Sequence, residues 1–262
     1  MTEASKDPRQ GLDVKDFEAL VADHGAALHR MAVYLVRDRV LAEDLVQETY
    51  ARALEHRGQF RGEADVRSWL RRILHNLAID RARRSAHELP VEDVEDKWRD
   101  DAYTVDAEIV VQRAQLRHEL EDALVRLPFI YRAAVVLHDV EEWKVREIAH
   151  VTGVELPAAK QRLRRGRMMM VTALAAGTER RAVLKGVPMR CWDARSKVSD
   201  YLDGLLDTGD RLVLEQHLER CPTCPPLYAS LVGVQTTLGA LRDPDSVIPP
   251  ALAARLHALI RP

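Results

Sequence analysis

Three cysteines and a histidine in the last third of the chain have the types and the spacing of metal ligands. His217 and Cys221 are four residues apart, so on a helix both side chains project from the same face. Cys224 follows Pro222, where that helix must be ending, and it can fold back toward the same point. Thiolates and imidazoles are preferred ligands of Zn²⁺. Together with Cys191, these residues predict a closed Cys3His zinc site of the structural, non-catalytic type.

Two helices must bring Cys191 to the other three ligands. Helices over 191–206 and 208–220, each of about 14 residues, would have similar lengths at about 1.5 Å per residue. If they pack antiparallel, the start of the first meets the end of the second, and every cysteine of the chain fits one site. The alternatives are three unrelated thiols, or a redox pair formed by Cys221 and Cys224. Because zinc-bound thiolates can be oxidised to a disulfide, redox sensing is a further hypothesis.

Residues 143–167 have the pattern of a helix-turn-helix, which predicts DNA binding. Residues 144–150 read as a short helix with apolar side chains on one face. Gly153 suits a turn with positive φ, and Pro157 suits the first turn of the next helix, where its missing N–H has no partner. That helix has Leu163 facing inward and carries five cations for phosphates and base edges: Lys160, Arg162, Arg164, Arg165 and Arg167. The alternative is a basic surface helix that binds nothing.

A helix with one acidic face is predicted near the N-terminal end of the chain. Small or apolar residues recur there at helical spacing, and the opposite face is acidic or polar. The first set is Ala42, Leu45, Val46, Thr49 and Ala53, and the second is Glu43, Asp44, Gln47 and Glu48. Gly58 and Gly62 mark a break, after which a second helix is expected over 65–84.

The net charge of the 262-residue chain is only −2, but the charges are grouped in blocks. Residues 57–84 hold eight arginines against three acids, residues 85–108 hold nine acids against two cations, and residues 160–167 hold five cations and no acid. Such blocks indicate a polyanionic partner, although any single block can be merely a solvated face. Apolar runs are far shorter than the roughly 20 residues of a membrane helix, and no secretory signal is visible, so we expect a cytoplasmic protein without membrane contact.

These elements predict an all-α fold with three helical blocks. The first block ends near residue 84, and the second runs over about 112–174. Residues 85–108 lack helical periodicity and contain Pro90, so we expect a linker there. A connector over 177–188 precedes the third block. Strand signals are scarce.

Several motifs follow one another along the first two-thirds of the chain: 42–50, 60–63, 67–70, 76–84, Leu127-Pro128 and 153–167. In this order and spacing they resemble the extracytoplasmic-function (ECF) group of bacterial RNA polymerase sigma factors. The resemblance implies sigma domain 2 over 1–84, an acidic interdomain linker over 85–111, sigma domain 4 over 112–176 and a connector over 177–189. It also implies a transcription initiation factor that confers promoter choice on core RNA polymerase without being an enzyme.

The resemblance also implies roles for residues of the first block. In the family the acidic helix of domain 2 binds the clamp helices of the polymerase β′ subunit, and domain 4 contacts the β flap. Asp44, Gln47 and Glu48 match the β′-binding positions. The following segment captures the melted −10 strand, whose flipped bases need stacking surfaces and whose backbone needs cations. The matching residues are Phe60, Arg67, Trp69, Arg71, Arg72, Asn76, Arg83 and Arg84, with a core position between helices as the alternative for Trp69.

By the same resemblance, residues 157–167 form the recognition helix for the −35 element of promoter DNA. Its implied DNA-binding residues are Lys160, Arg162, Arg164, Arg165 and Arg167. One departure is the run Glu-Leu-Pro-Ala-Ala over 155–159, where the family often has small or polar residues. This departure leaves the preferred −35 sequence open.

The third block, 190–262, resembles the zinc-binding anti-sigma domain, which in most relatives is a separate protein that holds a sigma factor inactive. Here it is fused behind the sigma-like part, which predicts tuning of activity in cis; a separate anti-sigma factor is a further partner that the resemblance allows. Two apolar stripes at helical spacing follow the cysteines. They are Leu227, Leu231, Val234, Leu238 and Leu241, and then Leu252, Leu256 and Leu259. We predict that one stripe lies against domain 2 or domain 4 and competes with polymerase, the alternative being packing within the module itself.

Two other functions compete with a sigma factor. A stand-alone DNA-binding repressor would use only the helix-turn-helix, and it would have no use for the acidic motif from Asp44 to Glu48. A zinc hydrolase needs an open metal position and a general base, whereas all four predicted ligands are already assigned to a closed site. The sequence therefore favours a sigma factor.

Overall fold

The structure is a computed structural model, and it describes residues 16–36, 38–60, 65–82, 90–178, 180–181, 189–242 and 248–260. Contacts within the chain divide it into two compact units. Unit 1 comprises residues 1–84, 149–153 and 243–262, and unit 2 comprises residues 85–148 and 154–242.

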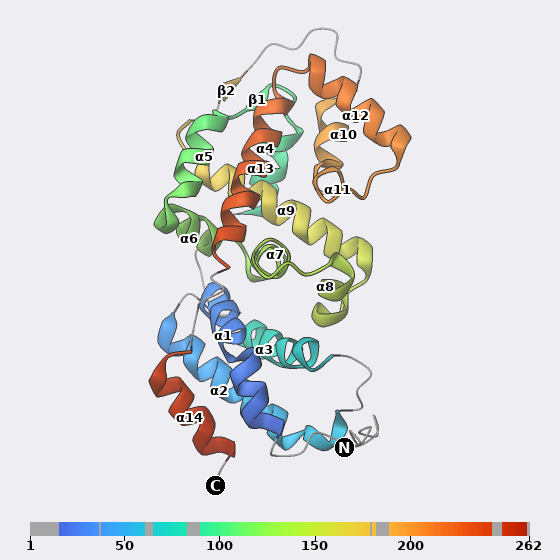
Figure 1. The fold of residues 1–262 in the computed structure, drawn as a ribbon. Coiled ribbons are helices and arrows are strands. Elements are labelled where there is room, and N and C mark those ends of the chain that lie inside the picture. Colours follow the sequence, from blue (N-terminus) through green and yellow to red (C-terminus); the bar gives the residue numbers. More distant parts are fainter. Residues whose placement is uncertain are drawn as a thin grey trace, which may run out of the picture. The chain divides into compact units, whose positions relative to one another are not determined.

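The main helices of unit 1 come from both ends of the chain (Figure 1). They are α1 (Asp16–Val36), α2 (Arg39–Glu55), α3 (Val66–Ala82) and α14 (Pro250–Ile260), with a 3-10 turn η1 (Arg57–Gln59) after α2. Phe17, Leu45 and Leu70, from α1, α2 and α3, are fully buried between the helices. Asp38 starts α2, since its carboxylate accepts hydrogen bonds from the amides of Val40 and Leu41.

Helix α14 packs on α1 and α2, although some two hundred residues separate them in sequence. Leu252 and Leu256, on its inner face, have no exposed surface. Ile248 lies so close to Gly25 of α1 that a Cβ added at that glycine would stand 3.1 Å from its Cγ2 atom. The second apolar stripe of the sequence, Leu252, Leu256 and Leu259, therefore belongs to a helix that packs against the first helical block and not within the third.

Unit 2 contains the remaining elements (Figure 1). They are α4 (Val91–Arg99), β1 (Tyr103–Thr104), α5 (Ala107–Gln115), α6 (Arg117–Arg126), α7 (Phe129–Val135), the π-turn η2 (Val136–Val140), α8 (Val145–Thr152, whose last residues belong to unit 1), α9 (Leu156–Leu174), β2 (Arg180–Arg181), α10 (Cys191–Ser196), α11 (Val198–Leu202), α12 (Thr208–Arg220) and α13 (Cys224–Ala240).

Helix α9 is the centre of unit 2. Leu163 is buried, as its predicted inward orientation required, and Met168, Met169 and Met170 have no exposed surface. Gly166 allows α7 to approach closely, because a Cβ there would stand 2.6 Å from Val135 Cγ2. On another side α13 packs on α5 and α9 through the first apolar stripe. The helix that carries the predicted DNA-binding cations is thus fixed by packing along most of its length.

The all-α fold is confirmed, with one small addition. Over the described residues, β1 and β2 form a two-residue antiparallel pair in which Tyr103 faces Arg181 and Thr104 faces Arg180. No helix in the described part of the chain is long and apolar enough to cross a membrane.

Two expectations about helices were wrong. Part of the predicted non-helical linker is α4, whose Val94 and Trp98 are buried four residues apart on one face. The single helix expected over 191–206 is divided into α10 and α11 and ends at Leu202, because Gly204 turns the chain with a φ of +66°.

Candidate functional site

The four predicted metal ligands come together in unit 2. Cys191 begins α10, His217 lies in the last turn of α12, and Cys221 follows that helix directly. Cys224 is the first residue of α13. All four residues are buried, and their ligand atoms lie within 4.8 Å of one another. The start of the first predicted helix and the end of the second therefore meet, as the spacing predicted, and the start of α13 adds Cys224.

The site has the features of a metal centre. Neither ring nitrogen of His217 has a hydrogen-bond partner among the described residues, although the side chain is completely buried. A buried imidazole without partners is costly, and a metal ion would satisfy one nitrogen. The sulfurs of Cys191 and Cys221 are 3.6 Å apart. Hydrogen bonding among the sulfurs raises the pKa of Cys191 and Cys224 and lowers the pKa of Cys221, so a cation is needed to hold all three as thiolates.

Thr223, one of the two residues between the last two cysteines, connects the metal centre to the segment after α4. Thr223 is completely buried, and its hydroxyl donates to the carbonyl of Asp101 at 3.0 Å. In return, its backbone carbonyl accepts from the hydroxyl of Thr104. Arg195 of α10 donates to Thr223 and to the carbonyls of Trp98, Asp100 and Tyr103. The segment from 98 to 104 is therefore hydrogen-bonded directly to the metal-binding module.

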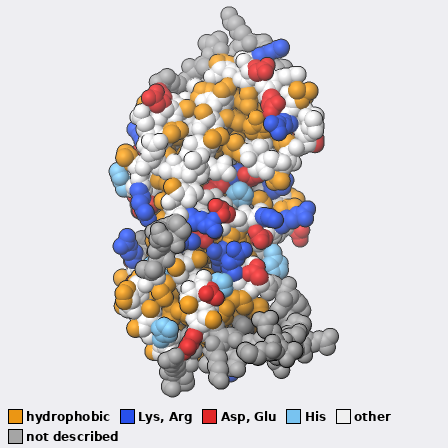
Figure 2. All heavy atoms as spheres, viewed as in Figure 1, with side chains coloured by type: hydrophobic (Ala, Val, Ile, Leu, Met, Phe, Trp, Pro, Cys, Tyr) orange, Lys and Arg blue, Asp and Glu red, His pale blue; other side chains and the backbone are white. Residues whose placement is uncertain are grey.

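The five cations of α9 have very different surroundings. Lys160 is a third exposed and pairs with Asp200 of α11 at 3.1 Å. Arg165 forms a two-pronged ion pair with Glu95 of α4, at 2.6 and 3.3 Å. Arg162 is half-buried and forms no ion pair with another described residue. Figure 2 shows that Lys and Arg side chains and Asp and Glu side chains are both present at the molecular surface.

Arg164 and Arg167 are held more tightly. The guanidinium of Arg164 lies over the ring of Trp192 of α10, 5.2 Å from its centroid. Arg167 is only 2% exposed and is paired with Asp139 and Asp203 at 2.6 and 3.0 Å. Burial would lower the pKa of Arg167, but these two carboxylates raise it. Arg167 is thus an interior ion-pair residue in this structure rather than part of an exposed basic face.

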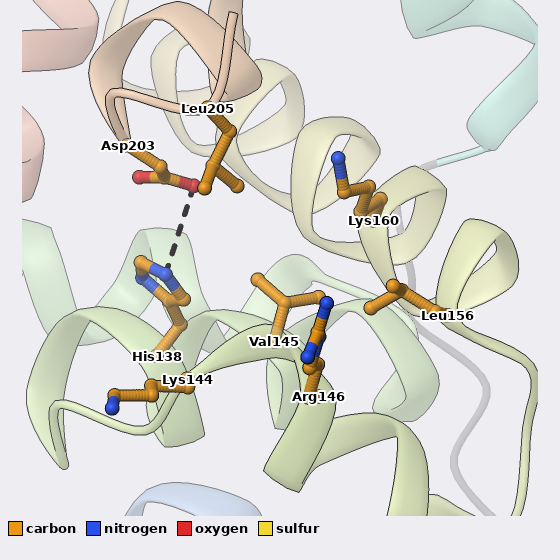
Figure 3. A pocket seen from close by; sticks show the side chains of 8 residues that line it. All are labelled: His138, Lys144, Val145, Arg146, Leu156, Lys160, Asp203 and Leu205. Carbon is orange, nitrogen blue, oxygen red and sulfur yellow. Dashed lines mark ion pairs between the residues drawn. The ribbon is translucent and has the colours of Figure 1, made fainter.

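A cleft of about 470 Å³ lies between α8–α9 and the segment that follows α11 (Figure 3). Lys144, Arg146 and Lys160 line it from the helix-turn-helix side, and Asp203 and Leu205 line it from the other. His138 Nε2 and Asp203 Oδ2 face each other across it at 3.6 Å. The cationic face of the helix-turn-helix is therefore turned toward the metal-binding module.

In unit 1 the acidic face of α2 contacts the C-terminal helix. Arg255 of α14 donates to Glu43 at 2.6 Å and to Asp44 at 3.2 Å. Of the other two residues assigned to polymerase binding, Gln47 is half-buried, and Glu48 pairs with Arg52 and with Arg81 of α3. Of the three residues assigned to polymerase binding, Asp44 therefore forms an ion pair with α14.

The predicted −10 residues are grouped around one aromatic pair. The rings of Phe60 and Trp69 lie 5.1 Å apart, and both side chains are half-buried, so Trp69 is not a fully buried core residue. Arg67, Arg72 and Asn76 are exposed on α3, whereas Arg71 is buried. Arg83 and Arg84 lie outside the described residues.

Sequence reasoning missed the partners of the predicted residues. These are Arg255 on α2, Asp200, Asp203 and Trp192 beside α9, and Thr223 and Arg195 at the metal centre. Asp200 and Asp203 are three residues apart, which was a readable signal of one acidic helix face. The rest are pairs between residues far apart in sequence, and local patterns carry no trace of them.

Comparisons with known proteins follow the same division of the chain. Residues 20–88 match Sigma-70 region 2, residues 117–170 match Sigma-70 region 4, and residues 191–224 match a putative zinc finger. The chain is 36% identical over 161 residues to the ECF RNA polymerase sigma factor SigM of Mycobacterium tuberculosis, covering 60% of this chain and 76% of that protein. It is 33% identical over 159 residues to the ECF sigma factor SigE of Mycolicibacterium smegmatis, covering 61% and 62%. It is 34% identical over 150 residues to the sigma factor CarQ of Myxococcus xanthus, covering 57% and 84%.

Proposed function

The chain belongs to the ECF RNA polymerase sigma factors, transcription initiation factors that act with core RNA polymerase and promoter DNA, and we propose that its segment 190–262 restrains that activity in cis. The observation that carries the proposal is the α14–α2 contact, made by Arg255 with Glu43 and Asp44 and by the buried Leu252 and Leu256. A polymerase surface and α14 cannot occupy the same face of α2 at the same time.

Helix α2 is the proposed polymerase-docking element. Its Asp44, Gln47 and Glu48 are at least partly accessible, whereas Leu45 and Val46 face the core. A row of acids and amides on a helix held rigidly from behind suits a basic or polar partner surface. The β′ clamp helices are the proposed partner of this face, and the β flap that of domain 4. Domain 2 and domain 4 are proposed over 1–84 and 112–176, and their overlap with the matched ranges 20–88 and 117–170 supports the order of the two domains.

The metal in the Cys3His site is proposed to be zinc. Three thiolates and an imidazole suit a borderline-soft ion with tetrahedral geometry, and four protein ligands leave no open position for catalysis. Zinc–sulfur bonds of about 2.3 Å separate two sulfurs by about 3.8 Å in a tetrahedron, close to the 3.6 Å between Cys191 and Cys221. Bound zinc would stabilise the fold where α10, α12 and α13 meet. Cys191, His217, Cys221 and Cys224 would hold it.

The promoter contacts are proposed on two surfaces. Around Phe60 and Trp69, a flipped base of the −10 strand could stack on a half-exposed ring, while Arg67 and Arg72 meet the backbone and Asn76 a base edge. On α9, the exposed part of the helix-turn-helix would read the −35 element in the major groove. These assignments rest on exposure, charge and motif position.

The polymerase-docking proposal is tested by the affinity of the full-length chain for core RNA polymerase. Arg255→Ala removes two partly exposed ion pairs from the α14–α2 contact, each worth about 0.2–1 kcal/mol, so binding should tighten by about two- to thirty-fold. Gln47→Ala should weaken binding, because it removes a proposed polymerase contact without touching that ion pair. Arg211→Ala, which breaks an exposed ion pair on α12, is the matched control.

The outcomes separate the alternatives. If Arg255→Ala binds core polymerase no better than Arg211→Ala does, α14 does not restrain docking. If neither the wild type nor Arg255→Ala binds, the proposed docking of α2 on core polymerase is wrong.

A further inference from the structure

The cations on one flank of α9 are already neutralised within unit 2. Lys160, Arg164 and Arg167 are spaced at i, i+4 and i+7 and therefore share one side of the helix. Against them stand Asp200 and Asp203 from the α11 region and the ring of Trp192 from α10. All three opposing groups belong to the metal-binding module.

The contacts resemble those that a nucleic acid would make. Carboxylates replace phosphates as partners of Lys160 and Arg167, at 3.1 and 3.0 Å. Trp192 presents a flat ring to Arg164 on one side and to Arg99 of α4 on another, with guanidinium-to-centroid distances of 5.2 and 5.1 Å. Arginine packs on aromatic faces in the same way as it packs on bases.

Linker helix α4 covers a neighbouring part of α9. The Glu95 carboxylate accepts hydrogen bonds from Nε and Nη2 of Arg165, and its Oε1 atom lies 3.9 Å from Nη2 of Arg164. Its side chain is only 11% exposed, so this carboxylate lies in the interface between the two helices. Of the five predicted DNA-binding cations, four therefore have a protein carboxylate or ring in the place of DNA.

The geometry excludes entry of α9 into a major groove while these contacts persist. The groove of B-DNA is about 12 Å wide, and a helix with side chains is about 10–12 Å across. A second helix packed alongside at about 8–10 Å leaves no space for the groove wall on that side. The cleft of about 470 Å³ that Lys144, Arg146 and Lys160 share with Asp203 and Leu205 is too small to admit a duplex (Figure 3).

We propose that Trp192, Asp200 and Asp203, together with Glu95 of the linker, act as an intramolecular DNA mimic that masks the recognition helix. The inference deepens the proposed cis restraint and rests on it for the role of α9 as the promoter-reading helix. It adds a second blocked activity, DNA binding, which is separate from the α14–α2 contact in unit 1. Binding of duplex DNA requires α10 and α11 to leave the flank of α9.

The test is the affinity of the full-length chain for a fluorescein-labelled 20-base-pair duplex of arbitrary sequence, measured by fluorescence anisotropy at low and at physiological salt. Asp200→Asn breaks one partly exposed ion pair and should tighten binding about two- to five-fold. Trp192→Ala combined with Asp200→Asn also removes the stacking on Arg164, and it should tighten binding about ten-fold or more.

The variant Asp210→Asn is the control for the effect of net charge on DNA binding. Asp210 lies on α12 of the same module and pairs with Lys197, so the variant has the same net charge as Asp200→Asn but leaves the α9 flank covered. Unchanged metal content and circular dichroism establish that each variant is folded. If the Trp192→Ala/Asp200→Asn variant binds the duplex no more tightly than Asp210→Asn, the mimic is wrong.

Hydrogen exchange of the wild-type chain provides a second measurement. Saturating duplex should raise amide exchange over 192–203 while lowering it over 157–165. Unchanged or slower exchange over 192–203 in the presence of bound duplex would overturn the proposal. Asp200→Asn should leave the affinity for core polymerase unchanged, so failure of the mimic and failure of the α14–α2 restraint are observed in different assays.

Discussion

Leu256→Ala is the sharpest perturbation of the α14–α2 contact. Leu256 has no exposed surface, and its helix packs on α1 and α2. The rest of unit 1 keeps its own core, because Phe17, Leu45 and Leu70 are buried among α1, α2 and α3. The substitution should therefore weaken the attachment of α14 rather than unfold unit 1.

The expected gain in polymerase affinity follows from the complete burial of the Leu256 side chain. Truncating a fully buried leucine to alanine costs about 2–5 kcal/mol, and here that cost falls on the closed state, in which α14 is attached. At about 1.4 kcal/mol per factor of ten, even the lower figure raises the ratio of open to closed molecules about thirty-fold. Since polymerase binds only the open state, apparent affinity is the intrinsic affinity multiplied by the open fraction. Affinity for core polymerase should therefore rise about thirty-fold or more, until it reaches the intrinsic affinity as its ceiling.

The assay is equilibrium binding of the labelled full-length chain to core RNA polymerase. His257→Ala, an exposed neighbour on the same helix, is the control and should change the affinity by less than about two-fold. Circular dichroism and thermal melting establish that both variants keep unit 1 folded. If Leu256→Ala lowers the melting temperature of unit 1 but leaves polymerase affinity equal to that of His257→Ala, α14 stabilises the fold without restraining docking, and the reasoning is refuted.

Three further predictions concern unit 2. Cys221→Ser should reduce bound zinc from one ion per chain to substoichiometric amounts and unfold the α10–α13 module, because the metal supplies folding free energy there. Native zinc content by mass spectrometry, together with native melting, would contradict this prediction. Thr223→Val should destabilise the chain by about 1–3 kcal/mol in urea unfolding with zinc retained, because the carbonyl of Asp101 loses its buried donor. The control is Thr236→Val, which removes an exposed hydroxyl bonded within α13 and should have little effect. Burial alone would raise the pKa of Asp139, but the hydrogen bond from His138 and the charge of Arg167 hold this pKa below its usual value. The stabilising contribution of Asp139 is therefore present above the unfolded-state pKa of about 4, and it is lost as the pH falls below that value. Asp139→Asn should therefore be less stable than the wild type at pH 7 and lose less stability on acidification from pH 5 to pH 3; parallel losses in the two proteins would show that Asp139 does not carry the acid sensitivity.

Local patterns in the sequence were sufficient for most of the helices and for the predicted ligand set. The spacing of His217, Cys221 and Cys224 follows from helix geometry and a proline stop, and Cys191 was the only other cysteine available. Leu163 could be assigned to the core because a helix of alternating cations and apolar residues has one inward face. The apolar spacing of Val91, Val94 and Trp98 also predicts α4, although the density of acids around it concealed the helix.

The state of each charged side chain, in contrast, could not be read from the sequence. Lys160, Arg162 and Arg167 are all cations on one helix, yet the first is paired at the surface, the second has no described ion-pair partner and the third is buried. Asp200 lies 40 residues from Lys160 in sequence, and Asp203 lies 36 residues from Arg167. Asp200 and Asp203 reach these cations because α11 packs on α9.

The sequence by itself determined the family, most of the helical elements and the residues able to bind a metal, since those depend on residue type and on spacing within a helix or a turn. Only the tertiary structure decided which of the predicted binding surfaces are covered. Arg255 reaches Glu43 across more than two hundred residues, and Asp200 reaches Lys160 across forty. The physical reason is that covering a surface depends on contacts between elements, whose free energy comes from packing and charge pairing that no periodicity along the chain records.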